Sequence, residues 1–185
     1  MGGTFDPIHL GHLRAAENAR EGLGLDEVRF LPAQVPPHRA APASSPRDRY
    51  AMVALATALH PRFVADDLEL CREGPSYTVD TIARLRDERP GDDVVLIVGS
   101  DTYPELSTWK EHDRLFRMCT VAVVSRPDAG GPRDAAEAAG VRRVPGAGLA
   151  VSATDIRRRV KEGLSIRYLV PETVADYIAK RGLYR

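Results

Sequence analysis

Short, strongly apolar runs alternate along the chain with longer stretches whose apolar residues recur at helical spacing. The run from 94 to 98 is apolar throughout, which is typical of a strand buried on both faces of a sheet. The stretch from 47 to 59 instead places Tyr50, Val53 and Ala54 on overlapping faces of a helix. These patterns predict strands over 27–31, 63–70, 94–98, 120–125 and 141–144, helices over 10–23, 47–59, 77–89, 133–139, 154–162 and 172–180, and short helical pieces at 103–106 and 113–118.

This alternation of strands and helices predicts an α/β fold, in which helices cover both faces of a doubly wound, mostly parallel sheet. A chain of 185 residues fits a single domain, here 1–185, with a helical C-terminal part from about residue 152. In open sheets of this kind, ligands bind beyond the carboxyl ends of the strands. The stretch 40–46, rich in Pro, Ala and Ser, is interpreted as a loop over such a site.

The amino-acid composition excludes several classes of protein. The 26 basic and 26 acidic side chains cancel, which argues against a protein that coats nucleic acid or an anionic membrane. Cys71 and Cys119 form no metal-binding spacing, and two thiols exclude a disulfide framework. The longest apolar runs fall far short of the ~20 residues that a membrane span needs. We therefore expect a soluble protein of the cytoplasm.

Two glycines and two histidines flank a proline turn in the sequence GGTFDPIHLGH (residues 2–12). Gly2 and Gly3 let backbone N–H groups approach a phosphate, because no Cβ stands in the way. The helix that begins near residue 10 aims its unpaired N–H groups and positive dipole end at the same place. His9 and His12 share one face of its first turn and add two donors. Either ring alone could be an ordinary core or surface histidine, but the combination predicts a polyphosphate site, without a Walker lysine.

Two further segments predict anion contacts. Ser152 and Asp155 have the spacing of a helix-capping pair, and Thr154 and Arg157 lie one turn apart at the start of the same helix. An ordinary capped surface helix is the plain alternative. The loop PPHR (36–39) is stiffened by its prolines and presents Arg39, which could equally be a solvated loop residue.

The motif of residues 2–12 resembles that of the (H/T)xGH nucleotidylyltransferase superfamily, and within it the chain most closely resembles bacterial nicotinate-nucleotide adenylyltransferases. This resemblance implies a Rossmann-like fold and transfer of the adenylyl group of ATP to nicotinate mononucleotide, giving nicotinate adenine dinucleotide and pyrophosphate in NAD biosynthesis. It assigns catalysis to His9, His12 and Arg157. Mg²⁺ would bridge phosphate oxygens and be held by substrate and water, because the sequence offers no dedicated carboxylate cage.

The resemblance also implies a binding site for each substrate. The carboxylate of Asp101, at the end of strand 94–98, would meet ribose hydroxyls, and Trp109 would stack on the pyridinium ring, a cation–π contact worth ~1–2 kcal/mol when desolvated. The N–H groups near Thr78 and Lys110 would hold the nicotinate carboxylate. The expected ATP-binding residues are Gly2, Gly3, Thr4, Phe5, Gly11, Arg39, Gly99, Asp101, Arg126, Ser152, Thr154 and Ile156, and the expected acceptor-binding residues are Tyr77, Thr78, Trp109 and Lys110.

The chain departs from the family pattern in two places. Relatives begin with a strand that leads into the glycine pair, whereas only Met1 precedes Gly2 here. We expect either a translation start further upstream or, in protein beginning at Met1, a gap or a substitute in the sheet beside strand 27–31. In addition, His112 stands where many relatives carry a second aromatic residue after the tryptophan.

Other functions are compatible with parts of this pattern. A sister transferase could use nicotinamide mononucleotide, phosphopantetheine or, with CTP, an alcohol phosphate, because the first motif is common to all of them. A nucleotide-sensing module without catalysis would also keep an ATP site. Ser76, Tyr77, Thr78 and Trp109 favour the nicotinate acceptor.

Overall fold

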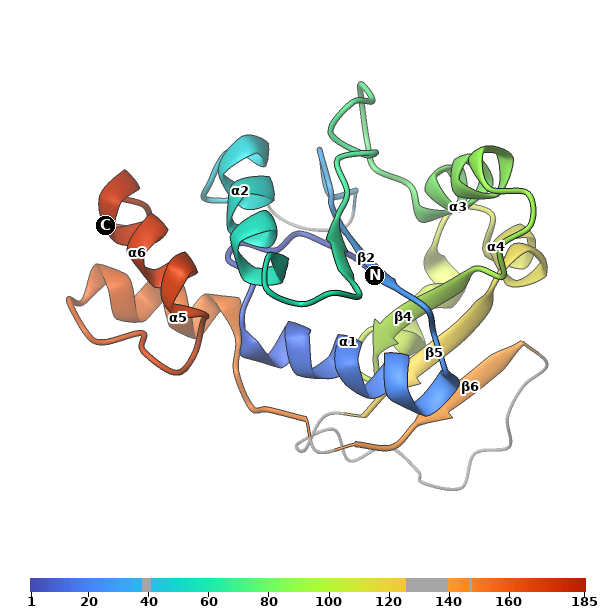
Figure 1. Ribbon diagram of the computed structural model, residues 1–185. Coiled ribbons are helices and arrows are strands. Elements are labelled where there is room, and N and C mark those ends of the chain that lie inside the picture. Colours follow the sequence, from blue (N-terminus) through green and yellow to red (C-terminus); the bar gives the residue numbers. More distant parts are fainter. Residues whose placement is uncertain (38–40, 126–139, 147) are drawn as a thin grey trace.

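The computed structural model describes residues 1–37, 41–125, 140–146 and 148–185, and it contains two parallel three-stranded sheets (Figure 1). In the first, β1 (Gly2–Gly3) pairs with β2 (Val28–Pro32), which pairs with β3 (Phe63–Ala65). In the second, β4 (Val95–Gly99) pairs with β5 (Thr120–Val124), which pairs with β6 (Val141–Val144). The predicted strand 63–70 ends early, because a turn begins where the Asp66 carboxylate accepts the N–H of Leu68 at 3.0 Å.

The helices begin and end within two residues of their predicted bounds. Local signals account for their ends: Ser45 and Ser152 each accept an N–H of the first turn, and Gly24 and Gly182 end helices in the left-handed conformation. The predicted helix 133–139 lies outside the described residues. The helices are α1 (Leu10–Leu23), α2 (Pro46–Thr57), α3 (Thr78–Glu88), the 3₁₀ helix η1 (Tyr103–Thr108), α4 (His112–Met118), α5 (Ala153–Lys161) and α6 (Glu172–Arg181).

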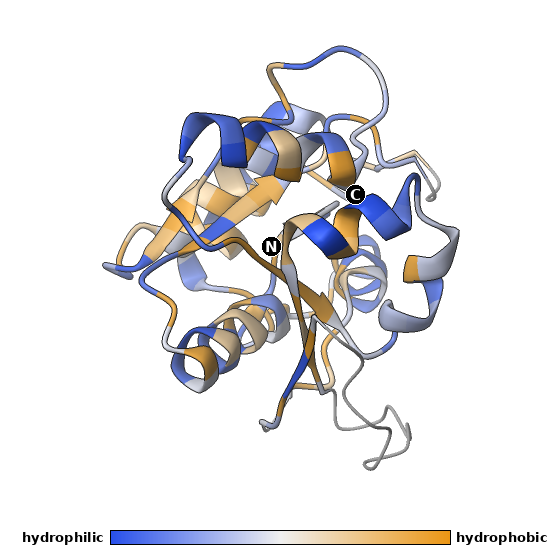
Figure 2. Ribbon diagram, turned by 90° about the vertical axis from the view of Figure 1, so that its right-hand side faces the viewer, coloured by the Kyte–Doolittle hydropathy of each residue, from blue (hydrophilic) through white to orange (hydrophobic). Residues whose placement is uncertain are grey.

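Helices cover both faces of the second sheet, as predicted. Alternate residues of the apolar run in β4 face different clusters: Ile97 packs with α1, whereas Leu96 and Val98 pack with residues of η1 and α4 such as Leu106 and Leu115. Burial on both faces therefore explains why this run is continuously apolar. Figure 2 shows the strands as mostly hydrophobic ribbons, with hydrophilic residues gathered on the outer helices and loops.

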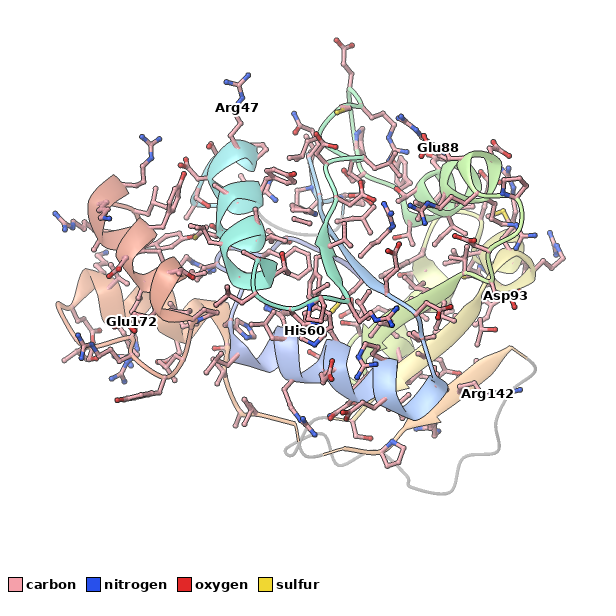
Figure 3. The ribbon with its side chains drawn as sticks, viewed as in Figure 1. Arg47, His60, Glu88, Asp93, Arg142 and Glu172 are labelled. Carbon is pink, nitrogen blue, oxygen red and sulfur yellow. The ribbon has the colours of Figure 1, made fainter. Side chains whose placement is uncertain are left out.

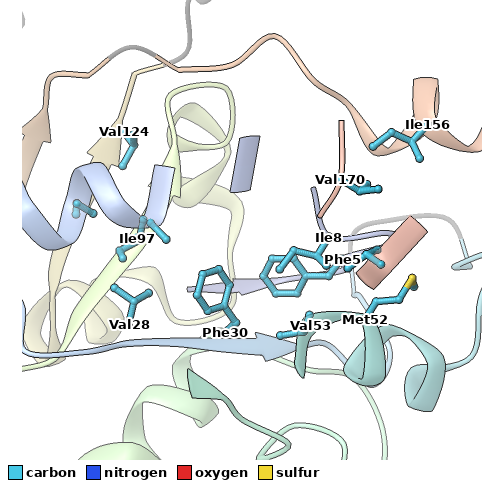
Figure 4. Close-up of a cluster of buried hydrophobic side chains, with 14 of the residues drawn as sticks. Phe5, Ile8, Val28, Phe30, Met52, Val53, Ile97, Val124, Ile156 and Val170 are labelled. Carbon is cyan, nitrogen blue, oxygen red and sulfur yellow. The ribbon is translucent and has the colours of Figure 1, made fainter. Parts of the chain in front are cut away.

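The larger apolar cluster joins the two sheets. Phe5 and Ile8, which follow β1, pack with Phe30 of β2, with α2 and with α6 (Figure 4). Charged side chains such as Arg47 and Glu172 lie at the periphery (Figure 3), and among the described helices none is long and apolar enough to cross a membrane.

A gap separates the two sheets. β1 has two residues and pairs with β2, and within the described ranges no pairing joins it to β4. A cavity of about 1130 Å³ lies there, with Met1, Arg29 and Val95 among its walls. Next to the pairing of β1 with β2, the amino group of Met1 donates to the Arg29 carbonyl at 2.7 Å. Burial lowers the pKa of this amino group to about 6.

Candidate active site

A cavity of about 570 Å³ opens beyond the carboxyl ends of β1, β2, β4 and β5. Its volume is in the usual range for small-molecule sites. Helices α1, α3 and α5 begin at its wall, so three helix N-termini face one space. The cavity collects sixteen of the nineteen residues expected in the site: Gly2, Gly3, Thr4, Phe5, His9, Gly11, His12, Tyr77, Thr78, Gly99, Asp101, Trp109, Lys110, Ser152, Thr154 and Arg157.

Buried side chains hold the loop between β1 and α1 in place. Phe5 has a positive φ of 50° and is 2% exposed, and a Cβ added to Gly3 would lie 3.0 Å from its ring. The guanidinium of Arg49, itself fully buried, donates to the Thr4 carbonyl at 2.8 Å and to the Gln34 carbonyl at 3.2 Å. Burial lowers the pKa of Arg49. The loop is thus tied to the end of β2 before any ligand binds.

The two histidines are arranged as a pair at the start of α1. His9 is the N-cap residue and is 1% exposed, and its ring stacks on that of His12 with the centroids 3.6 Å apart. The N–H of His9 donates to Nδ1 of His12 at 3.2 Å. Because Nδ1 accepts, the proton of a neutral His12 ring is on Nε2, which makes Nε2–H the donor of this side chain.

Gly11 provides the space for this pair. A Cβ added to Gly11 would lie 3.0 Å from Nδ1 and 3.1 Å from Cε1 of His9, and 3.4 Å from the carbonyl oxygen of Leu149. Gly99 has the same relation to another site residue, because its added Cβ would collide with the Asp101 carboxylate. Both glycines therefore set the position of a neighbouring polar side chain.

Helix α5 brings the second predicted anion site to the first. Ser152 caps the helix by accepting the N–H of Asp155 at 3.2 Å. Arg157 donates to the Asp6 carbonyl at 2.7 Å and to Oγ1 of Thr154 at 3.3 Å. Ile156 differs from the other expected residues, because its side chain is fully buried in the core and does not line the cavity.

The part of the cavity predicted to bind the acceptor joins the start of α3 to the loop after η1. Tyr77 is the N-cap residue of α3, so the first N–H groups of the helix point toward the cavity. Trp109 ends η1 and is half-buried against the second cluster. The ammonium of Lys110 lies 3.2 Å from Asp80 and 4.6 Å from the centroid of the Tyr77 ring, which holds this loop against α3.

Buried polar groups support the acceptor side. Oγ of Ser76 accepts the N–H of Gln34 at 2.9 Å, which ties the start of α3 to the end of β2. Glu69 accepts from Oγ1 of Thr81 at 2.8 Å. Burial raises the pKa of Glu69, against the opposing effect of its bonds to Thr81 and Ser76.

The comparisons with known proteins agree with this geometry. The cytidylyltransferase-like family model matches residues 1–159. A probable nicotinate-nucleotide adenylyltransferase of Thermus thermophilus is 50% identical over 186 residues, covering all of this chain and 97% of the relative. A protein of the same name from Chromohalobacter salexigens is 42% identical over 205 residues, covering all of this chain and 94% of the relative. The chain belongs to the nicotinate-nucleotide adenylyltransferase family.

A solved structure shows the same fold. Nicotinic acid mononucleotide adenylyltransferase of Plasmodium falciparum, in complex with NaAD, matches 99% of this chain and 94% of its own with a TM-score of 0.82 at 16% identity. The predicted Rossmann-like α/β fold and the family resemblance are both confirmed.

Two residues expected in the site, Arg39 and Arg126, lie outside the described residues, as does the neighbouring His38.

Sequence reasoning about this adenylyltransferase missed several residues that build the site. Asp6 was given no role of its own, and it proves to be a buried acceptor for distant groups. The buried Arg49 gave no local signal, because its partners are carbonyl groups of two other loops.

Proposed function

We propose that the protein transfers the adenylyl group of ATP to nicotinate mononucleotide and releases pyrophosphate. One observation carries the proposal: a single cavity joins the paired histidines and Arg157 to the α3 N-terminus and Trp109. The first group suits a triphosphate and the second a small aromatic acid. Membership of the nicotinate-nucleotide adenylyltransferase family supports the same reaction.

The chemistry is a displacement at the α-phosphorus of ATP. An oxygen of the mononucleotide phosphate forms the new bond, and the bond from the α-phosphorus to the oxygen bridging to the β-phosphorus breaks, with its electron pair leaving on pyrophosphate. The attacking phosphate is already anionic, so no base is required. Positioning and charge stabilisation are therefore the main tasks of the protein.

The histidine pair and the start of α1 would stabilise the charge that develops on the transferred group. Nε2–H of His12 and the ring of His9 would donate to the non-bridging oxygens, beside the positive end of the α1 dipole. Arg157 of α5 would add a cation to the same site. Its bond to the Asp6 carbonyl keeps the guanidinium beside the same loop.

The acceptor side favours the acid over the amide. A carboxylate at the N-terminus of α3 gains from the helix dipole and from the unpaired N–H groups of the first turn, whereas a neutral amide gains less. Trp109 offers its indole face for a pyridinium ring. These two contacts are the basis for naming nicotinate mononucleotide as the acceptor.

We treat the metal ion as part of the substrate, MgATP. Within the described ranges no three His, Cys, Asp or Glu side chains cluster in a way that could hold a metal ion. Asp6, the carboxylate nearest to the histidine motif, has both oxygens engaged by protein donors. The residues present therefore do not fit a dedicated metal cage, and we assign no catalytic step to the metal.

We also propose that residues 1–185 form one nucleotidylyltransferase domain that acts in the cytoplasm. The packing of α6 on α2 and the bond from Arg157 to Asp6 support a C-terminal part that completes the ATP side. Two free thiols suit a reducing compartment.

The decisive experiment measures pyrophosphate release from MgATP with one acceptor at a time: nicotinate mononucleotide, nicotinamide mononucleotide and phosphopantetheine. We expect kcat/KM to be at least tenfold higher for nicotinate mononucleotide than for the amide. Preference for another acceptor would refute the assignment of the acceptor site. Tight ATP binding without release for any acceptor would identify a sensor.

A further inference from the structure

The last residues of the chain fold back onto the catalytic loop. Helix α6 ends at Arg181, and Gly182 follows with a φ of 63°. The N–H of Leu183 then returns to the carbonyl of Ile178 at 3.1 Å, and Tyr184 itself has a φ of 65°. Two left-handed residues so close together reverse the direction of the chain, and Tyr184 packs against the larger apolar cluster.

The hydroxyl of Tyr184 binds a carboxylate 178 residues away. It donates to Oδ1 of Asp6 at 2.7 Å, and Oγ of Ser44 donates to the same oxygen. The N–H of Ala43 donates to Oδ2 at 2.7 Å. Asp6 is only 5% exposed, so these three donors replace the water that its carboxylate has lost. Burial, together with the Asp6 carboxylate, raises the pKa of Tyr184, which keeps the hydroxyl a donor.

Asp6 connects these donors to the reaction site. Its backbone carbonyl accepts from Nη1 of Arg157, and His9 follows three residues later. Asp6, Ala43, His9 and Arg157 all line the catalytic cavity, whereas Tyr184 does not. The tyrosine therefore lies behind the wall, where its hydroxyl contacts Asp6 and also lies 3.2 Å from Oγ of Ser44.

We propose that Tyr184 is a positioning residue for the ATP site: its hydroxyl fixes Asp6, and Asp6 fixes Arg157 and the turn that leads to His9. The inference deepens the adenylyl transfer proposed above and depends on it for the identity of the reaction. It concerns ATP alone, because the acceptor side of the cavity is built from α3 and η1, whereas the Tyr184 hydroxyl contacts Asp6 and Ser44.

The test compares Tyr184→Phe with the matched variant Tyr177→Phe. Both substitutions remove one hydroxyl from the C-terminal segment, and in both cases that hydroxyl donates to a carboxylate, since Tyr177 donates to Asp48 at 2.9 Å. Asp48 does not line the cavity. We expect Tyr184→Phe to lower kcat/KM for ATP by about fivefold to tenfold, a part of the effect of one hydrogen bond to a charged group because two donors remain. KM for nicotinate mononucleotide should stay within about twofold of the native value.

A purely structural role predicts a different result. In that case Tyr184→Phe would lower the melting temperature but leave kcat and both KM values unchanged at 25 °C, as we expect for Tyr177→Phe, and the proposal would be overturned. If Tyr184→Phe does not fold, Ser44→Ala removes the other hydroxyl from the same Asp6 oxygen and should give the same loss in kcat/KM for ATP.

ATP affinity measured by calorimetry without acceptor separates this inference from the proposed function. A native protein that binds ATP but releases no pyrophosphate would refute the function. A higher Kd for ATP in Tyr184→Phe, with an unchanged Kd in Tyr177→Phe, would still support the positioning role. If both variants had the same Kd for ATP as the native protein, the positioning role would be refuted.

Discussion

Replacing Gly11 by Ala should lower kcat while leaving the stability of the protein nearly unchanged. The added Cβ would lie 3.0 Å from Nδ1 of His9, whereas ordinary contacts begin near 3.4 Å, so the ring must move by about 0.4 Å. Since a misplacement of 1 Å costs roughly 10²-fold, we expect kcat to fall by about tenfold. Gly11 is the second residue of α1, where Ala is favoured over Gly by about 0.5–1 kcal/mol, which offsets the strain of the shifted ring.

Gly22→Ala is the matched control for this prediction. Gly22 lies in the same helix, and its added Cβ would meet a Val144 side-chain atom at 3.1 Å; neither residue lines the cavity. The control should change the melting temperature but leave kcat for pyrophosphate release at the native value. If Gly11→Ala retains kcat within twofold, the position of the His9 ring does not limit the reaction and the reasoning fails.

Three further predictions follow from the same geometry. His12→Ala should lower kcat by about 10²–10³-fold, the usual cost of one preorganised donor, with the fold retained by circular dichroism; a loss under tenfold would exclude a catalytic role. Trp109→Ala should raise KM for nicotinate mononucleotide by about tenfold, from the loss of a stacking contact of ~1–2 kcal/mol, with KM for ATP unchanged as the internal control. In protein that begins at Met1, the amino-group pKa falls from 8.0 when unfolded to about 6 when folded. The unfolded state then binds more protons between these values, so the free energy of unfolding should fall by roughly 2 kcal/mol from pH 8 to pH 6. Urea denaturation measures this loss, and acetylation of the amino group should abolish it.

Most of the features that could be predicted depend on residues that lie close together in the sequence. The bounds of α1 were predicted to the residue, because the histidine motif marks its start and Gly24 its end. The paired histidines and the cap at Ser152 depend on contacts between residues three apart, which sequence spacing reveals. Ile156 was assigned to ATP from its place in a motif. Helical spacing turns it about 100° away from Arg157, and that direction leads into the core.

Contacts between distant segments could not be predicted from local pattern. Asp6 and Tyr184 are 178 residues apart, and neither residue carries a spacing that points to the other. Arg49 is fully buried although its sequence neighbourhood reads as an ordinary helix, because its partners are carbonyl oxygens whose positions depend on the whole fold. Such groups become recognisable only when the site is assembled.

The gap between the two sheets gives α1 a special role in assembling the site. β1 and β2 lead to the part of the cavity proposed to bind phosphate, whereas β4 leads to Asp101 and Trp109, and among the described strands no backbone ladder connects the two halves. Helix α1 begins at the end of the short β1 and packs along β4, β5 and β6. Its N-terminus holds the histidines, so the same helix that presents the donors also sets their distance from the acceptor side. The packing of α1 against β4, β5 and β6 therefore contributes to the alignment of the two substrates, and substitutions on the buried face of α1, such as those at Ala16 and Ala19, should affect catalysis together with stability.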